Sequence, residues 1–416
     1  MTFEELKRLL FVRGNFGVKL GLDGMREACA LLGNPERAAP ALHVAGTNGK
    51  GSTCAFTEAS LRAAGVRTGL YTSPHLNHFC ERIRIGGSPI SEERACELLE
   101  EVRARVPWAL GDPGLTFFEI VTLMAFLAFR EVEVMVVEVG LGGRLDATNV
   151  VEPRACAVSA LGLEHTQYLG PTLAHIAREK AGIFKSPAPA VSAGQPWQAA
   201  QTLQQRAEEL GISLWRPGRD YRFESRDDRP FCYAGPRWTV RAEPSLAGHY
   251  QRANAALACA LLEASGFCEA RHAEQGLQSA RWPARLERFG NVYVDGAHNP
   301  HAVRALAHAL PRLLRGRPLQ LVFGALEDKD AAAMLDALAP LARSVHYCAP
   351  GSPRAIPPER LARIRPGFVH PGVAVALAAA RDLPGMVLCC GSLYLAGEAR
   401  ALLLGEIHST MPAERL

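Results

Sequence analysis

The sequence has no CxxC pair and no regular spacing among its 11 cysteines, so it shows no zinc pattern. Cys389 and Cys390 are adjacent, which disfavours a disulfide between them. An odd cysteine count in a chain of 416 residues is typical of free thiols in a reducing compartment. We therefore expect a cytoplasmic protein without disulfides.

Long apolar runs are also absent. The longest, Ile120 to Phe129, falls far short of the ~20 residues that span a bilayer. The first residues, MTFEELKRLL, are charged and amphipathic and lack the apolar core of a signal peptide. No coiled-coil repeat is present. These features favour a soluble monomer with no membrane partner.

Neither charge sign dominates. Lys and Arg number 46 and Asp and Glu 42, which leaves a net charge of +4 without a long basic run. Nucleic-acid binding usually needs a denser basic face, so no such partner is expected. A weakly positive protein that takes anionic small molecules is the simpler interpretation.

Short apolar runs alternate with helical patterns through the first half of the chain, which is typical of a doubly wound, mostly parallel α/β sheet. Strands are expected at Ala41–Ala45, Val66–Tyr71, Val132–Val139, Ala155–Leu161 and Ala188–Ala193. Helices are expected at Thr53–Ala64, Thr116–Arg130, Leu173–Gly182 and Gln198–Leu210.

Residues 213–246 interrupt this pattern with Arg, Pro, Trp and Tyr and predict a short β excursion, followed by a helix over Gln251–Ala264. A second alternation follows Trp282 and Pro283, with strands expected at Val292–Asp295, Leu319–Phe323, Ser344–Cys348 and Met386–Cys390. We therefore predict two domains, residues 1–283 and a smaller α/β domain of residues 284–416.

The segment HVAGTNGKGST, residues 43–53, places a glycine-rich turn between a strand and a helix. Backbone amides of such a turn close around phosphate oxygens, and the helix N-terminus adds partial positive charge. Lys50 is expected to reach the β/γ-phosphates, and Ser52 or Thr53 to cap the helix or lie near a metal. The ordinary phosphate-loop pattern would place a glycine at Val44, so the loop is a shorter form.

Further blocks follow in order: GLYTSPHLNHFCERIRI, LTFFE, EVGLGGRLDATNVV, LEHTQYLGPTLAHIAREKAGIFK, RWPARLE, DGAHNPHA, EDKD and CGSLYL. With the loop, they make the chain resemble the dihydrofolate synthase/folylpolyglutamate synthase family of the Mur ligase superfamily, from about residue 14 to about residue 397. The resemblance implies an ATP- and Mg²⁺-dependent ligase that activates a folate-type carboxylate as an acyl phosphate and joins glutamate to it.

The resemblance also implies metal ligands, namely Ser73, Glu138 and His165, and hard oxygen ligands suit Mg²⁺. It implies that Lys180 carries a CO₂-derived carbamate and helps to hold a second Mg²⁺. Relatives usually have Asp where this chain has Glu164. The residues expected to be catalytic are Lys50, Glu138, His165 and Lys180.

For ATP, the resemblance implies contacts from both parts of the chain, by Thr47, Asn48, Gly49, Lys50, Gly51, Ser52, Asn254, Arg285, Asp295 and His298. Tyr250 stands where relatives often have His, and Ala284 where they usually have Gly.

For the folate, it implies three segments: Gly17, Val18, Lys19 and Leu20; Thr116, Phe117, Phe118 and Glu119; and Leu145, Asp146 and Ala147. One or both phenylalanines could stack on a flat ring or belong to the core. The block LGLER of relatives is here Leu20–Gly24, LGLDG.

Three functions are compared on this evidence. The first is the folate ligase, acting on dihydropteroate, on folate glutamates or on both. The second is a Mur-type ligase of peptidoglycan synthesis, which would share the loop but not YTSPHL or LGGRLDATN. The third is a nucleotide-binding switch protein, which would need no second domain bearing WPAR and DGAHN.

Overall fold

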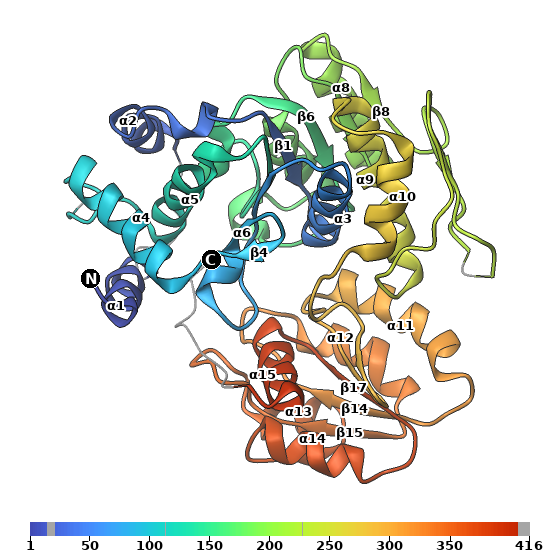
Figure 1. Ribbon diagram of the computed structural model, residues 1–416. Coiled ribbons are helices and arrows are strands. Elements are labelled where there is room, and N and C mark those ends of the chain that lie inside the picture. Colours follow the sequence, from blue (N-terminus) through green and yellow to red (C-terminus); the bar gives the residue numbers. More distant parts are fainter. Residues whose placement is uncertain (15–20, 113, 227, 407–416) are drawn as a thin grey trace.

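The computed structural model describes residues 1–14, 21–112, 114–226 and 228–406, and its largest element is an eight-stranded sheet (Figure 1). The strand order is β4-β3-β2-β5-β1-β6-β7-β8. All neighbours pair in parallel except β3 and β4, which continue one edge antiparallel. The strands are β1 (Ala41–Ala45), β2 (Thr68–Tyr71), β3 (Ile83–Ile85), β4 (Ser88–Pro89), β5 (Val134–Glu138), β6 (Pro153–Val158), β7 (Ala190–Ser192) and β8 (Leu214–Trp215).

Helices cover both faces of this sheet (Figure 1). One face shares a core with α1 (Phe3–Gly14), α2 (Asp23–Leu31), α4 (Glu92–Arg105) and α5 (Phe117–Ala128). The other packs against α3 (Lys50–Ala63), α9 (His249–Ser265) and α10 (Ala270–Ser279). A further core joins β6 and β7 to α7 (Leu173–Lys180) and α8 (Trp197–Glu209). Strands buried on both faces read as continuous apolar runs, and the predicted doubly wound class is confirmed.

The predicted β excursion is a small antiparallel sheet. Its strands are β9 (Arg222–Phe223), β10 (Tyr233–Ala234) and β11 (Thr239–Val240), in the order β11-β10-β9. The Tyr233 hydroxyl donates to the buried Glu263 carboxylate of α9 at 2.7 Å. This bond fixes the small sheet on the helix that covers the large one.

The second alternation forms a six-stranded sheet in the order β12-β13-β17-β14-β15-β16, in which only β12 is antiparallel. Its strands are β12 (Glu287–Phe289), β13 (Val292–Val294), β14 (Leu319–Phe323), β15 (Ser344–Tyr347), β16 (Phe368–Val369) and β17 (Met386–Cys390). One core holds α11 (Pro300–Leu314), α12 (Ala331–Leu338) and α13 (Pro358–Ile364), and another holds α14 (Val373–Arg381) and α15 (Leu393–Leu404).

Short helices connect these elements: η1 (Pro35–Arg37), η2 (Phe79–Arg82), η3 (Phe129–Glu131), η4 (Ala147–Val150), α6 (Thr166–Leu169), η5 (Ala181–Ile183) and η6 (Ala339–Leu341). All eleven cysteines are free, as expected. Among the described residues, no helix has the length and apolar character needed to cross a membrane.

Candidate active site

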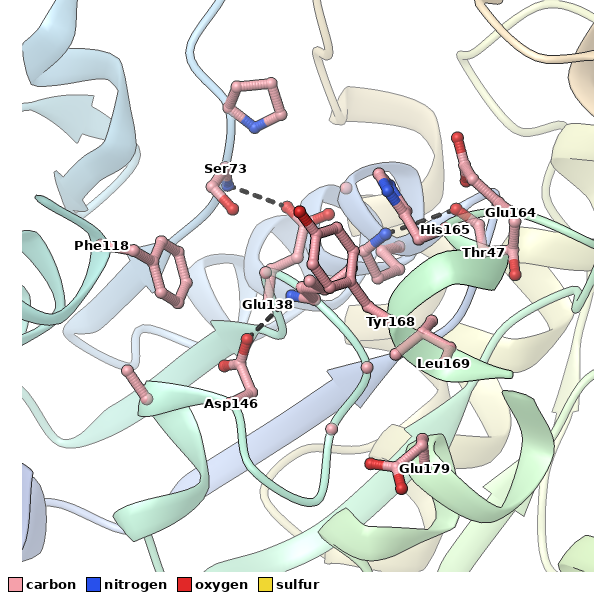
Figure 2. A pocket seen from close by; sticks show the side chains of 18 of the residues that line it. Thr47, Ser73, Phe118, Glu138, Asp146, Glu164, His165, Tyr168, Leu169 and Glu179 are labelled. Atoms are coloured by element: carbon pink, nitrogen blue, oxygen red, sulfur yellow. Dashed lines mark hydrogen bonds between the residues drawn. The ribbon is translucent and has the colours of Figure 1, made fainter. Parts of the chain in front are cut away.

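The loops that follow β1, β5 and β6 surround a cavity of about 230 Å³, here named the active cavity (Figure 2). These strands are parallel neighbours, so the loops at their carboxyl ends meet at one edge of the sheet. The predicted residues that line it are Thr47, Asn48, Gly49, Lys50, Gly51, Ser52, Ser73, Thr116, Phe117, Phe118, Glu119, Glu138, Leu145, Asp146, Ala147, His165, Arg285 and His298.

Four predicted folate contacts, Gly17, Val18, Lys19 and Leu20, lie outside the described residues. Three further predicted site residues do not line the active cavity: the metal ligand Lys180 and the ATP contacts Asn254 and Asp295. Each is buried.

The phosphate loop connects β1 to α3. Gly49 has a φ of 91°, and a Cβ there would stand 2.3 Å from Asn254 Oδ1. The loop therefore needs glycine at this position, and Asn254 lies directly against it. The Lys50 ammonium donates to the Thr47 carbonyl at 3.3 Å, which folds this side chain back over the loop.

The start of α3 corrects one expectation. Gly49 is the N-cap of α3, and no side chain caps the helix. Ser52 and Thr53 therefore lie within the first turn of the helix and do not cap it. The left-handed backbone of Gly49 starts the helix earlier than the apolar pattern indicated. Ser52 still lines the active cavity.

Glu138 is the last residue of β5 and is almost fully buried. The backbone N–H of Ser73 donates to Glu138 Oε2 at 3.3 Å (Figure 2). Burial raises the pKa of this carboxyl to about 6, although the nearby Lys50 ammonium opposes the rise. A nearby cation stabilises the ionised form of a buried carboxylate. Glu138 is therefore suited to bind a metal ion.

His165 and Lys180 approach the same region from α6 and α7. Burial lowers the pKa of His165 to about 4, so its imidazole is neutral at pH 7 and able to bind a metal. Burial, aided by Lys50, lowers the pKa of Lys180 to about 7. The lowered pKa makes the neutral Lys180 amine more accessible near pH 7, and only a neutral amine adds CO₂.

The described residues contain no group of three or more His, Cys, Asp and Glu side chains placed to hold a metal. The predicted set of Ser73, Glu138, His165 and Lys180 includes only two such side chains. Its remaining ligands would be a hydroxyl and a carbamate. The donor set fits Mg²⁺ only if Lys180 is modified, because an ammonium repels a cation.

On the folate side, the two phenylalanines differ. Phe117 is 5% exposed, meets Phe79 edge to face and lies under the Arg82 guanidinium, so it belongs largely to the core. Phe118 is half-buried at the cavity wall, where a Cβ on Gly140 would come within 2.5 Å of its ring. Figure 2 shows Phe118 facing the cavity.

Several folate-side polar groups also hold the backbone. Thr116 and Glu119 form a capping box at the start of α5, with bonds of 2.8 and 3.2 Å. Asp146 accepts from the backbone N–H of Leu141 at 2.8 Å and of Thr148 at 3.0 Å. These contacts shape the walls of the active cavity.

The six-stranded sheet contributes Arg285, His298 and Leu393 to the same cavity. Arg285 follows Ala284, which has a φ of 54°, the conformation for which glycine is better suited. Its guanidinium donates to the Ala284 carbonyl at 2.8 Å. The segment before β12 therefore places the Arg285 guanidinium in the cavity that the phosphate loop also lines.

The buried Asp295 carboxylate stabilises the positive charge of Arg285. It accepts from the backbone N–H of Leu286 at 2.9 Å and of Ala297 at 2.8 Å, and from the Tyr250 hydroxyl at 3.4 Å. Burial raises the pKa of Asp295, while Arg285 opposes the rise. The carboxylate is thus occupied in fixing the backbone directly after Arg285 and the turn that follows Asp295.

Sequence reasoning did not single out several other residues of the cavity wall, including Arg144, Tyr168, Leu169 and Glu179. Arg144 bonds Glu179 at 2.9 Å, and Tyr168 is 42% exposed. The ring of Tyr168 stands inside the view of the cavity in Figure 2. Arg144 lies within the block LGGRLDATN and Tyr168 within LEHTQYLG, but no local pattern distinguishes either residue from ordinary surface residues.

Comparison with known proteins agrees with this geometry. The family model of the Mur ligase, glutamate ligase domain matches residues 284–393. Dihydrofolate synthase/folylpolyglutamate synthase of Bacillus subtilis is 36% identical over 383 residues, 85% of this chain and 86% of the relative. This chain spans about half (51%) of a Halobacterium salinarum protein named probable bifunctional folylpolyglutamate synthase/dihydropteroate synthase, with 36% identity over 427 residues and 96% of this chain.

Two solved structures extend the likeness to three dimensions. Escherichia coli FolC in complex with DHPP and ADP has a TM-score of 0.89 and 33% identity, over 97% of this chain and 98% of that one. A Yersinia pestis bifunctional folylpolyglutamate synthase/dihydrofolate synthase complexed with AMPPNP and Mn ion has a TM-score of 0.84 and 34% identity, over 93% and 94%.

Proposed function

This chain belongs to the dihydrofolate synthase/folylpolyglutamate synthase family, and we propose on that premise how its active cavity performs the reaction. Members of the family are ATP-dependent ligases that join glutamate to folates. The observation that carries the proposal is one cavity in which a phosphate loop, the buried Glu138 and the aromatic Phe118 lie together. The peptidoglycan-ligase and switch-protein alternatives do not fit the family.

The chain is proposed to divide into two domains, residues 1–283 and 284–416, with ATP between them. Support comes from Arg285 and His298, which line the cavity opposite the phosphate loop. Asn254 and Asp295 are proposed to act at the nucleotide side, Asn254 against Gly49 and Asp295 through the turns around Arg285. Closure of the two domains would exclude water that hydrolyses an acyl phosphate.

The first chemical step is activation of the acceptor. A carboxylate oxygen attacks the γ-phosphorus of ATP, the bond to the bridging oxygen breaks, and ADP leaves. Lys50, Arg285 and the N-terminus of α3 offset the negative charge on the phosphates. The second step is amide formation: the glutamate amine attacks the acyl carbon, phosphate leaves, and the nitrogen gives up a proton.

Mg²⁺ would be held by Ser73, Glu138 and His165, and a carbamate on Lys180 would help to hold a second Mg²⁺. The metal, when bound, neutralises phosphate charge and positions the γ-phosphate. Burial raises the pKa of Glu138, so its ionised form is unfavourable in the protein alone. A divalent cation bound beside it would stabilise that ionised form.

The folate would lie toward Phe118, with its ring against the phenyl face and its carboxylate toward Lys50. Leu145, Asp146 and Ala147 form the wall beside it. A flat pterin stacks well on an exposed aromatic ring. The acceptor carboxylate belongs to dihydropteroate, to a reduced folate glutamate or to both.

One assay decides among these acceptors. Phosphate release from ATP is measured with Mg²⁺ and L-glutamate, with dihydropteroate in one sample and a reduced folate monoglutamate in the other. Products are identified by mass. Turnover with dihydropteroate alone identifies a dihydrofolate synthase, and turnover with both a bifunctional enzyme. No turnover in either sample contradicts the proposal. The expected monomer is tested on the same preparation by sedimentation.

A further inference from the structure

Arg285 lines the active cavity from a turn whose backbone has an unusual conformation. Ala284 has a φ of 54° and Leu286 a φ of 47°, so a non-glycine residue on each side of Arg285 adopts the left-handed region. That region is sparsely populated for such residues and persists only where surrounding contacts hold it. We name residues 284–286 the arginine turn. The contacts that stabilise this turn therefore determine where the Arg285 guanidinium lies.

Two carboxylates accept hydrogen bonds from the backbone of the arginine turn. The N–H of Leu286 donates to Asp295 Oδ2 at 2.9 Å, and the N–H of Ala284 donates to Glu287 Oε2 at 2.9 Å. Asp295 is buried, whereas Glu287 is half-buried at the start of β12. The position of the Glu287 side chain therefore depends on what else binds its carboxylate.

Arg400 of α15 binds that carboxylate. Its Nε donates to both oxygens of Glu287, at 3.1 and 3.0 Å. The Arg400 side chain is 20% exposed and the Glu287 side chain 25%, so water screens this pair less than it screens a surface ion pair. The carboxylate of Glu406 lies 3.8 Å from Arg400 Nη1, outside hydrogen-bonding distance. Glu287 is therefore the carboxylate to which Arg400 donates.

The Arg285 side chain itself fits closely against the start of α15. A Cβ on Gly296 would stand 2.5 Å from both Arg285 Nη1 and Leu393 Cδ2, so these two side chains pack directly over the glycine. Both side chains also line a smaller pocket beside the active cavity, together with Arg84 and Trp282. In such close packing, a shift of the arginine turn is transmitted to the guanidinium.

We propose that Arg400 is a positioning residue, which holds the arginine turn through Glu287 and so keeps the Arg285 guanidinium against the phosphates of ATP. This assignment rests on the function proposed above, in which Arg285 offsets phosphate charge. Arg400 is not among the described residues that line the active cavity, so it acts through the turn and not on the nucleotide. A misplaced cation binds the phosphates less well.

Binding of AMPPNP, an ATP analogue that does not transfer its γ-phosphate, tests this proposal without turnover. Its dissociation constant with Mg²⁺ is measured by calorimetry on full-length wild type, Arg400→Gln and Arg400→Lys. We expect a rise of about fivefold or more in R400Q and a smaller rise in R400K, which keeps the charge beside Glu287. Arg365→Gln is the matched control, because the exposed Arg365 donates to Asp336 at 3.1 Å, and it should bind as wild type.

A double-mutant cycle identifies the route by which Arg400 acts. Arg285→Gln removes the cation that the turn positions, so adding R400Q to it should change the dissociation constant by less than about twofold. Glu287→Ala removes the connection between Arg400 and Ala284, and it should weaken AMPPNP binding at least as much as R400Q does. A purely structural role would lower the melting temperature and leave the dissociation constant unchanged.

An AMPPNP dissociation constant within about twofold of wild type in R400Q overturns the role of Arg400. A full R400Q effect in the R285Q background also overturns it, because Arg400 then acts by another route. If R400Q does not fold, Glu287→Ala is judged by the same two criteria. Wild-type enzyme that binds AMPPNP but joins glutamate to neither acceptor contradicts the ligase reaction, whereas the AMPPNP values still decide the role of Arg400.

Discussion

Asn299 donates from Nδ2 to Glu164 Oε1 at 3.1 Å, and this bond connects the start of α11 with the loop that follows β6. The same amide exchanges bonds of 3.1 and 3.3 Å with Asn48 of the phosphate loop. Lys329 lies 3.4 Å and His298 3.7 Å from Glu164. Burial opposes ionisation of Glu164, but His298 and the Lys329 ammonium hold its pKa at about 2. Glu164 is therefore an anion around which the other part of the chain assembles.

Replacing this anion should weaken closure over ATP. Glu164→Ala removes the carboxylate that Lys329 and the Asn299 amide share, so Lys329 keeps only Asp328 and the Asn299 amide only Asn48 as acceptors. Bonds to charged groups contribute about 1.5–3 kcal/mol. We expect kcat/KM for ligation to fall by roughly 10–100-fold. Steady-state phosphate release measures this change.

Glu164→Asp provides the informative comparison, because it keeps the charge on a side chain that is one methylene shorter. A shorter carboxylate should retain most of the activity that Ala removes. Activity of Glu164→Ala within about twofold of wild type would show that the contact does not support turnover.

The two neighbouring phenylalanines should respond differently to truncation. Phe118→Ala removes a ring from the cavity wall, so we expect the KM for the folate to rise by about tenfold with little loss of stability. Phe117→Ala empties a core position and should lower the free energy of unfolding by about 3–5 kcal/mol. Kinetics and denaturant titration of both variants check this. Equal effects on KM would contradict the division of roles.

Much of the fold was predictable because buried parallel strands leave a clear local signal. The run Ala41–Ala45 has the same bounds as β1, and every predicted strand lies in one of the two parallel sheets. The edge strands β4 and β8 and the strand β3 beside β4 were not predicted. Each has only two or three residues, which is too short for an alternating pattern to distinguish it from a loop.

The site was predictable where a motif follows a strand, as at Lys50 and Glu138. Parallel packing then brings such strand ends together. Residues whose position depends on the tertiary arrangement could not be found this way. Arg84 lies on the unpredicted strand β3, and Trp282, whose ring its guanidinium covers, is about two hundred residues later in the sequence. Neither has a local pattern that indicates a shared pocket.

His43 should make the stability of the protein sensitive to acid. It is fully buried in β1, where its Nε2 lies 2.9 Å from Thr148 Oγ1. Burial, with Lys185 nearby, lowers its pKa to about 3, from about 6.5 in an unfolded chain. Between these values the unfolded state binds the extra proton, so stability is lost as the pH falls through this window.

At pH 5 this loss amounts to about 2 kcal/mol from His43 alone. His43→Gln keeps a polar group near Thr148 but cannot titrate. Between pH 8 and pH 5, wild type should lose about 2 kcal/mol more unfolding free energy than this variant. His175→Gln, at an exposed histidine, is the matched control and should follow wild type. Parallel pH profiles for all three proteins would rule out the buried histidine as the cause.

We expect Lys180 to support ligation only after its amine has reacted with CO₂ to form a carbamate. Its pKa near 7 makes a neutral amine available, and the addition of CO₂ would convert it into the carboxylate that the metal site lacks. Lys180→Ala is expected to lose ligation by about 100-fold or more and to regain part of it when short carboxylates such as acetate are added. Lys180→Arg should not be rescued, because its guanidinium fills the space and keeps its charge.

The modification can also be observed directly. After incubation with ¹³C-labelled bicarbonate, wild type should show a carbamate carbon by NMR that Lys180→Ala lacks. Below about pH 7 the amine is protonated, so this signal and the ligation rate should fall together. A ligation rate that persists in Lys180→Ala, or a wild type that shows no carbamate while fully active, would contradict the proposed carbamate on Lys180.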